Sequence, residues 1–186
     1  MKALTSLSRR AVAATLFITL LAAAASAQEG LGEAASKQLQ AQAEECGNAF
    51  IKGEYGRLVD CTLPKLVELV GGREKMVELV RRDVEQGKAE GFEPLSSTHS
   101  APTQVLRVGG QTYAVLPYKL RVRAPKEILV SDSFMIGVSN DGGQTWKFLS
   151  ADSADDARLK VLIPDAAGKL KLPSAKYSTE PLPAKP

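Results

Sequence analysis

The stretch SNDGGQTW, residues 139–146, restricts the fold of this chain more than any other feature. An Asp-Gly pair between two apolar segments is typical of a tight β-hairpin turn, because glycine adopts the positive φ angles that such turns require. Apolar residues alternate before the turn and resume after it at Trp146 and Phe148; before it they are Ile128, Val130, Phe134, Ile136 and Val138. We therefore predict that the C-terminal half of the chain is antiparallel β-sheet.

A second alternating segment covers residues 114–123, where Lys119, Arg121 and Arg123 form a basic stripe opposite an apolar face. This alternation is expected when one face of an antiparallel sheet is covered and the other is partly wet. We expect the basic stripe to be solvated or to meet an acidic partner.

The first half of the chain has a helical period instead. Apolar residues at spacings of three and four predict a helix that ends at Gly53; its stripe consists of Ala35, Leu39, Ala43, Cys46 and Phe50. We predict a short second helix that Pro64 stops, because proline cannot continue the hydrogen-bond ladder. A third helix is expected to start after Gly71-Gly72 and to end near Gly87.

Residues 1–27 have the composition of a signal peptide. Basic residues precede an uncharged apolar run over residues 11–25, and Ala25-Ser26-Ala27 offers the small side chains that cleavage requires. The run of about 15 residues is shorter than the roughly 20 that a membrane span needs, although a retained anchor is the alternative interpretation. We expect an exported protein, periplasmic or secreted, with a linker over residues 28–34 and no membrane segment after cleavage.

Removal of the signal changes the charge of the chain. It takes away three of the 24 basic residues and none of the 21 acidic ones, which leaves 21 of each. A net charge near zero disfavours nucleic-acid binding, since that requires an excess of cations facing phosphates. The remaining chain of about 159 residues fits one domain with one core.

The chain has two cysteines, Cys46 and Cys61, on either side of the helix turn near Gly53. In an oxidising compartment we expect them to form a disulfide that closes a loop of about 15 residues and contributes roughly 3 kcal/mol. Two unpaired, buried cysteines are the alternative.

Helices followed by a curled antiparallel sheet resemble the nuclear transport factor two-like superfamily. Its cone-shaped, cystatin-like α+β fold is shared with ketosteroid isomerases and polyketide cyclases. Residues 52–76 look like the helix, turn, helix, Pro, short strand and Gly-Gly-Arg pattern of exported members, and the hairpin SFMIGVSNDGGQTW adds to the resemblance. The resemblance implies three N-terminal helices and one domain over residues 35–151. We expect the Pro-rich extension, residues 152–186, to be partly disordered.

The same hairpin fits the Asp-box pattern, Ser-x-Asp-x-Gly-x-Thr-Trp, that recurs in sialidase-like propellers. A single copy without a blade-length repeat excludes a propeller. We interpret Trp146 as a packed turn anchor, with a ligand-site residue as the alternative.

Asp132 occupies the same pleat face as Val130 and Phe134. In the superfamily the helix-covered face lines a conical pocket, so the resemblance implies a pocket carboxylate with a raised pKa. Tyr55, Tyr118 and His99 are its expected neighbours. A β-bulge, a strand end or a capping role for Asp132 is the competing interpretation.

Superfamily members include enzymes, ligand binders and assembly modules, so the fold alone does not give the function. We expect a non-enzymatic exported module that binds a small apolar ligand or a partner protein through the pocket or the exposed sheet face, where a homodimer could form. The alternative is an isomerase-like or cyclase-like enzyme with Asp132 as general base and Tyr55 or Tyr118 as oxyanion donor. The single histidine, His99, predicts no metal site, since such sites usually need three or four ligands; we expect no cofactor.

Overall fold

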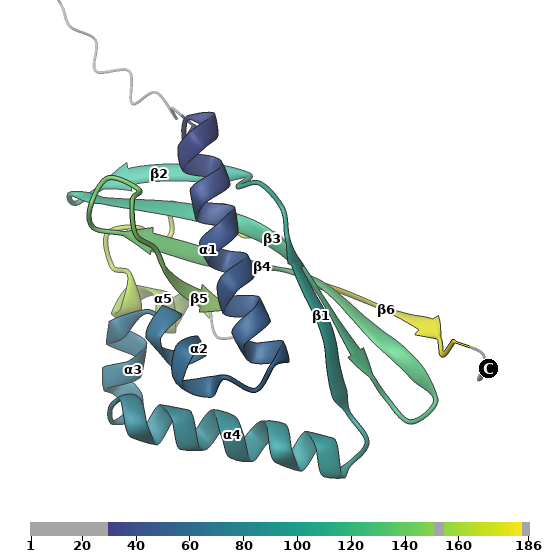
Figure 1. Ribbon diagram of the computed structural model, residues 1–186. Helices are drawn as coiled ribbons and strands as arrows, with labels where there is room; N and C mark the ends of the chain where they lie inside the picture. The colour runs from purple at the N-terminus through teal and green to yellow at the C-terminus, as the bar shows by residue number, and fades with distance from the viewer. Residues whose placement is uncertain (1–29, 151–154, 184–186) are drawn as a thin grey trace, which may run out of the picture.

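The computed structural model describes residues 30–150 and 155–183, which form an α+β fold (Figure 1). Four helices precede a curled antiparallel sheet, and a fifth helix lies between its last two described strands. The helices are α1 (Glu33–Ile51), α2 (Tyr55–Cys61), α3 (Pro64–Val70), α4 (Arg73–Ala89) and α5 (Asp156–Leu162). The strands are β1 (Glu93–His99), β2 (Gln104–Val108), β3 (Gln111–Arg123), β4 (Glu127–Ser139), β5 (Lys147–Ser150) and β6 (Lys176–Pro181). The predicted α+β class and the curled antiparallel sheet are confirmed.

Helix α1 forms where the apolar stripe predicted a helix. Leu39, Ala43 and Cys46 are buried on the side that faces the sheet. Gly53, with a φ angle of 73°, follows the helix and adopts this left-handed conformation without the steric cost that a side chain would add. The chain can therefore turn directly into α2.

Pro64 ends the α2 region and also begins α3, so four helices rather than three precede the sheet. The short strand that the resemblance implied after this proline is not present; the segment is helical. The reason is that proline suits the first position of a helix, where its missing N–H has no partner to lose and its fixed φ angle is already helical. Gly71, with a φ angle of 101°, closes α3 in the left-handed conformation.

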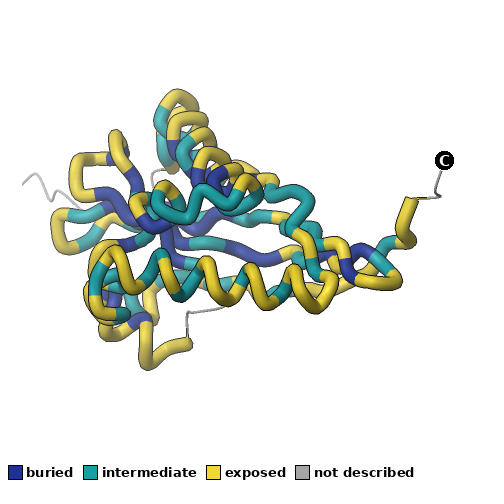
Figure 2. The backbone as a smooth tube through the Cα atoms, turned by 60° about the horizontal axis from the view of Figure 1, so that its bottom comes forward, coloured by how far each residue is buried: buried dark blue, intermediate teal, exposed yellow. Residues whose placement is uncertain are grey.

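Helix α4 is the least buried of the long elements. It begins after Gly71 and Gly72 and contains no buried residue. Figure 2 shows it entirely in the colours of half-buried and exposed residues. Only one side of α4, which includes Met76 and Val80, faces the interior.

The described part of the sheet contains six strands, with the long strands β3 and β4 at its centre. These two pair without a break from Thr112 opposite Ser139 to Arg123 opposite Ile128. Strands β1 and β2 share the outer edge of β3, and β5 and β6 share the outer edge of β4. This arrangement brings the C-terminal segment back into the sheet beside β4.

Hydrophobic clusters cover both faces of the sheet. The cluster on the side of α1 contains Leu39, Ala43, Cys46, Val105, Ala114, Leu116, Trp146 and Phe148. The cluster on the opposite side includes Tyr113, Val115, Phe134, Ile136, Val138, Leu149, Leu159, Leu162 and Ile163. Helix α5 thus packs on the face of the sheet opposite α1.

The predicted turn at residues 139–146 joins β4 to β5, and the carboxylate of Asp141 holds it together. This carboxylate accepts hydrogen bonds from the Thr145 hydroxyl at 2.6 Å, the Thr145 backbone N–H at 2.9 Å and the Ser139 hydroxyl at 2.7 Å. These bonds stabilise the ionised form and hold the pKa of Asp141 well below its usual range, with the Thr145 side chain as the largest cause. Trp146 is buried, and its indole N–H donates to the carbonyl of Gly143 at 3.0 Å.

Candidate ligand cavity

An apolar cavity of about 340 Å³ lies between the N-terminal helices and the sheet. Helices α1 to α4 contribute residues on one side, and β1, β3, β4 and β5 contribute residues on the other. Its apolar lining includes Phe50, Leu58, Val59, Leu66, Met76, Val80, Leu120, Met135 and Phe148. Its polar side chains are Thr62, Ser97, His99, Tyr118 and Ser150. Within the described residues, this lining contains no aspartate, glutamate, lysine or arginine.

His99, at the end of β1, is the most deeply buried polar side chain of the lining, with 5% of its surface exposed. Its ring stacks on that of Tyr118, its cross-strand partner, with 5.8 Å between the ring centroids. Neither ring nitrogen has a hydrogen-bond partner among the described residues. Burial lowers the pKa of His99, and the carboxylate of Glu44 offsets this only in part. The imidazole is therefore neutral at neutral pH and carries one donor and one acceptor.

Gly47 on α1 allows the ring of His99 to lie where it does. A Cβ atom at this position would lie 2.8 Å from Cε1 of His99 and 2.9 Å from Oγ of Ser97. Helix α1 and strand β1 can approach each other this closely only because no side chain stands between them. Our sequence analysis missed this residue, although a glycine within an amphipathic helix is a signal of close packing.

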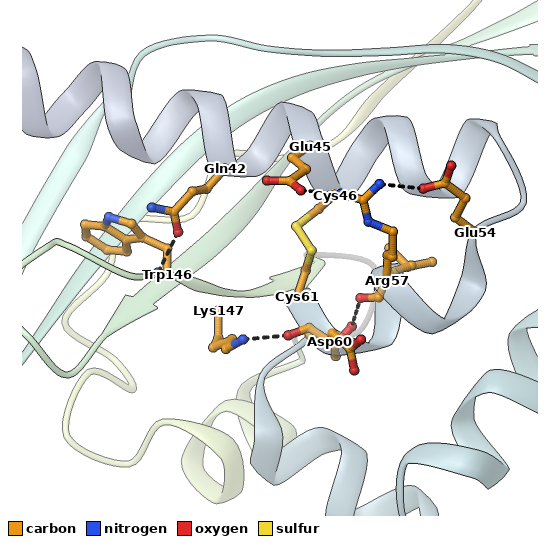
Figure 3. Close-up of a disulfide and its surroundings, with 11 residues drawn as sticks. Gln42, Glu45, Cys46, Glu54, Arg57, Asp60, Cys61, Trp146 and Lys147 are labelled. Atoms are coloured by element: carbon orange, nitrogen blue, oxygen red, sulfur yellow. Dashed lines mark hydrogen bonds and ion pairs between the residues drawn. A yellow bond between two sulfur atoms is a disulfide. The ribbon is translucent and has the colours of Figure 1, made fainter.

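The predicted disulfide between Cys46 and Cys61 is present and forms part of the cavity wall (Figure 3). It joins α1 to the end of α2 across a Cα–Cα distance of 6.0 Å. On the outer side of the disulfide, the guanidinium of Arg57 contacts the carboxylates of Glu45 at 2.7 Å and Glu54 at 2.9 Å. The two helices are thus linked by the disulfide and by the ion pair of Arg57 with Glu45, whereas Glu54 precedes the first turn of α2.

Of the aromatic residues predicted for the site, Tyr118 lines the cavity, whereas Tyr55 and Trp146 are not part of its lining. Tyr55 is the first residue of α2 and is half-buried. Trp146 packs in the cluster beneath α1, and its backbone N–H donates to Oε1 of Gln42 at 2.9 Å (Figure 3). The structure therefore brings His99 and Tyr118 together and leaves the other two aromatic residues elsewhere.

Asp132 lies on the sheet face opposite the cavity, which corrects the position expected for it. Its side chain is 51% exposed, and its carboxylate lies 3.4 Å from Nζ of Lys119, its cross-strand partner. Asp132 does share a pleat face with Val130 and Phe134, as the alternation predicted. That face, however, is opposite α1: Phe134 belongs to the hydrophobic cluster that includes Leu159 and Leu162 of α5.

The other two cations of the basic stripe also have partners within the chain. Arg121 pairs with Glu180 of β6, and Arg123 lies 3.0 Å from Glu93 of β1. All three pairs are partly exposed, so each contributes little to stability. The acidic partners of the basic stripe therefore belong to β1, β4 and β6 of the same sheet.

Several cavity residues had no distinctive signal in the sequence. In the sequence, Met76 and Val80 indicated only the inner side of a helix, and Ser97 was one polar residue among several near a strand end.

In residues 30–150 and 155–183, no helix combines the length and apolarity that crossing a membrane requires. Neither the models of known protein families nor the curated proteins compared with this sequence match it.

Proposed function

We propose that this protein is an exported, non-enzymatic module of the nuclear transport factor two-like superfamily that binds a small apolar ligand in the cavity. The observation that carries the proposal is the apolar lining of a space of about 340 Å³ with a few polar side chains. Ligand sites in proteins typically have this composition and volumes of about 300–1,000 Å³. The curled sheet with helices on its inner side is compatible with the superfamily, and the disulfide is compatible with an oxidising compartment.

A ligand would complete the packing of the side chains around the cavity. Protein interiors are close-packed, so side chains that border a space lack van der Waals partners on one side. An apolar molecule supplies those partners and is itself removed from water, which stabilises the complex by roughly 25 cal/mol for each Å² of apolar surface buried.

The position of Asp132 supports binding rather than catalysis by this residue. A general base must come within hydrogen-bonding reach of the proton that it removes. The carboxylate of Asp132 is on the far side of the sheet beside Lys119. The lining residues that the structure describes offer no other carboxylate.

Fluorescence titration with the neutral probe N-phenyl-1-naphthylamine tests the proposal. We expect a saturable increase in fluorescence as the probe enters the cavity. Val80→Trp adds an indole to the lining, and overpacking of about 1–3 kcal/mol should weaken probe binding by about fivefold or more. Val161→Trp adds the same group on the exposed surface of α5, beyond the sheet, and serves as the matched control.

Asp132→Asn provides a second control and should leave the affinity for the probe unchanged. Circular dichroism establishes that each variant retains the fold. The proposal fails if the wild-type protein shows no saturable binding, or if Val80→Trp and Val161→Trp weaken binding equally. A large loss of affinity in Asp132→Asn would restore that residue to the site.

A further inference from the structure

We infer that the cavity selects an uncharged amphiphile, a molecule with an apolar body and one neutral hydrogen-bonding group that meets the imidazole of His99. This inference rests on the proposed function and adds to it the chemical class of the ligand. Three observations support it: the ring nitrogens of His99 that have no partner among the described residues, the confinement of the ring by Gly47 and Tyr118, and the absence of charged side chains from the described lining.

The two ring nitrogens of His99 are buried and have no hydrogen-bond partner within the part of the chain that the structure describes, an arrangement that costs free energy until a partner is supplied. The ring cannot readily turn toward a partner elsewhere. Gly47 and Tyr118 confine it on two sides, and the backbone of His99 is held by the β1–β3 pairing. The side chain of Gln40 also donates to the carbonyl of His99 at 2.7 Å. A ligand group in the cavity is therefore the partner that the geometry favours.

The lining favours a neutral group over a charged one. A buried ion needs an opposite charge or several hydrogen bonds to replace its hydration. The described lining has no charged side chain, and the hydroxyl of Thr62 already donates to the carbonyl of Leu58 at 3.0 Å. A hydroxyl group loses less hydration than an ion, and it can donate to one imidazole nitrogen or accept from the other.

Competition with three naphthalene compounds tests this class directly. Naphthalene, 2-naphthol and 2-naphthoate share one rigid apolar body and differ in having no polar group, a neutral hydroxyl or a charged carboxylate. Each compound is titrated against protein that is loaded with N-phenyl-1-naphthylamine at neutral pH. One recovered hydrogen bond should make 2-naphthol bind about tenfold more tightly than naphthalene. We expect 2-naphthoate to bind more weakly than 2-naphthol.

His99→Phe keeps an aromatic ring but removes both nitrogens. It should abolish the preference for 2-naphthol over naphthalene. Thr98→Val is the matched control, since Thr98 is the exposed neighbour of His99 on β1, and it should keep the preference. A measurement on the wild-type protein avoids dependence on variants: His99 is the only histidine, so labelled histidine gives a single imidazole signal. Its ¹⁵N shifts report hydrogen bonding and should respond to 2-naphthol far more than to naphthalene.

The outcomes separate this inference from the proposed function. Failure of the probe and of all three compounds to bind overturns both. Binding of the probe with no preference among the compounds, or with a preference for 2-naphthoate, overturns the ligand class alone. The role of His99 is overturned if the preference for 2-naphthol persists in His99→Phe. It is also overturned if the imidazole ¹⁵N shifts do not change when 2-naphthol binds.

Discussion

Replacement of Gly47 by alanine sets two effects of known size against each other. Alanine in the interior of a helix is more favourable than glycine by about 0.8–1.0 kcal/mol. The new Cβ, however, would lie 2.8 Å from Cε1 of His99 and 3.0 Å from Cβ of Ser97, well inside the usual carbon–carbon separation of about 3.5–4.0 Å. Overpacking a buried site typically costs about 1–3 kcal/mol. We therefore expect Gly47→Ala to lower the free energy of unfolding by about 1 kcal/mol.

The two contacts with the new methyl group differ in how they can relax. The ring of His99 borders the cavity and can shift into it, which relieves part of the strain. Ser97 belongs to the paired strand β1, and its Cβ cannot move without the backbone. The same substitution should therefore also weaken binding of the fluorescent probe, because the displaced ring enters the space that the probe occupies.

Gly87→Ala in α4 is the matched control. The nearest atom to a Cβ at this position is Cβ of Phe92 at 3.9 Å, an ordinary contact. This variant should be stabilised by up to about 1 kcal/mol, the helix-propensity gain alone. Urea unfolding measures both variants, with the fluorescence of the buried Trp146, the only tryptophan, as the signal. If Gly47→Ala gains as much stability as Gly87→Ala, the close approach of α1 and β1 does not constrain the fold.

Three further predictions concern the disulfide and two titratable groups. Replacement of both Cys46 and Cys61 by alanine should lower the free energy of unfolding by about 3 kcal/mol, because the bond closes a 15-residue separation; equal urea midpoints for this variant and the oxidised protein would contradict it. Since burial lowers the pKa of His99 below its unfolded value of about 6.5, the unfolded state binds the proton more readily, and stability should fall as the pH drops below about 6.5. His99→Gln should flatten this dependence in urea midpoints between about pH 5 and about pH 7.5. The lowered pKa of Asp141 means that its contribution is present above about pH 4 and is lost as the pH falls through the folded-state pKa. Asp141→Asn should remove that part of the acid dependence, and an acid-unfolding curve of unchanged steepness would refute the assignment.

Local signals in the sequence were sufficient for much of the fold. The Asp-Gly turn and the alternation around it predicted β4 and β5, because turn chemistry and strand period both depend on near neighbours. The stripe from Leu39 to Cys46 predicted α1 for the same reason. The pairing of Cys46 with Cys61 followed from two cysteines on either side of a short helical turn.

The site was harder to predict, because it depends on which element covers which face. The alternation around Asp132 showed that one face of β4 is buried, but α5 could supply that cover as well as α1 could. Alternation of apolar and polar residues shows that a strand face is buried but does not show which helix covers it. His99 and Tyr118 meet because of the register between β1 and β3, and Gly47 matters only through its contact with a distant strand. Such relations arise from tertiary packing and leave no pattern within a short window of sequence.

The loose packing of α4 has a consequence for how a molecule could enter the interior. Local opening costs less free energy where fewer buried contacts are lost. Helix α1 contains buried residues and is cross-linked to α2, whereas α4 contains none and lies between Gly72 and Gly91, two glycines with positive φ angles. Outward movement of α4 is therefore expected to expose less buried surface than outward movement of α1. If His99 recognises a ligand as proposed, recognition would take place at the sheet wall of the cavity and exchange past α4 at its helical wall.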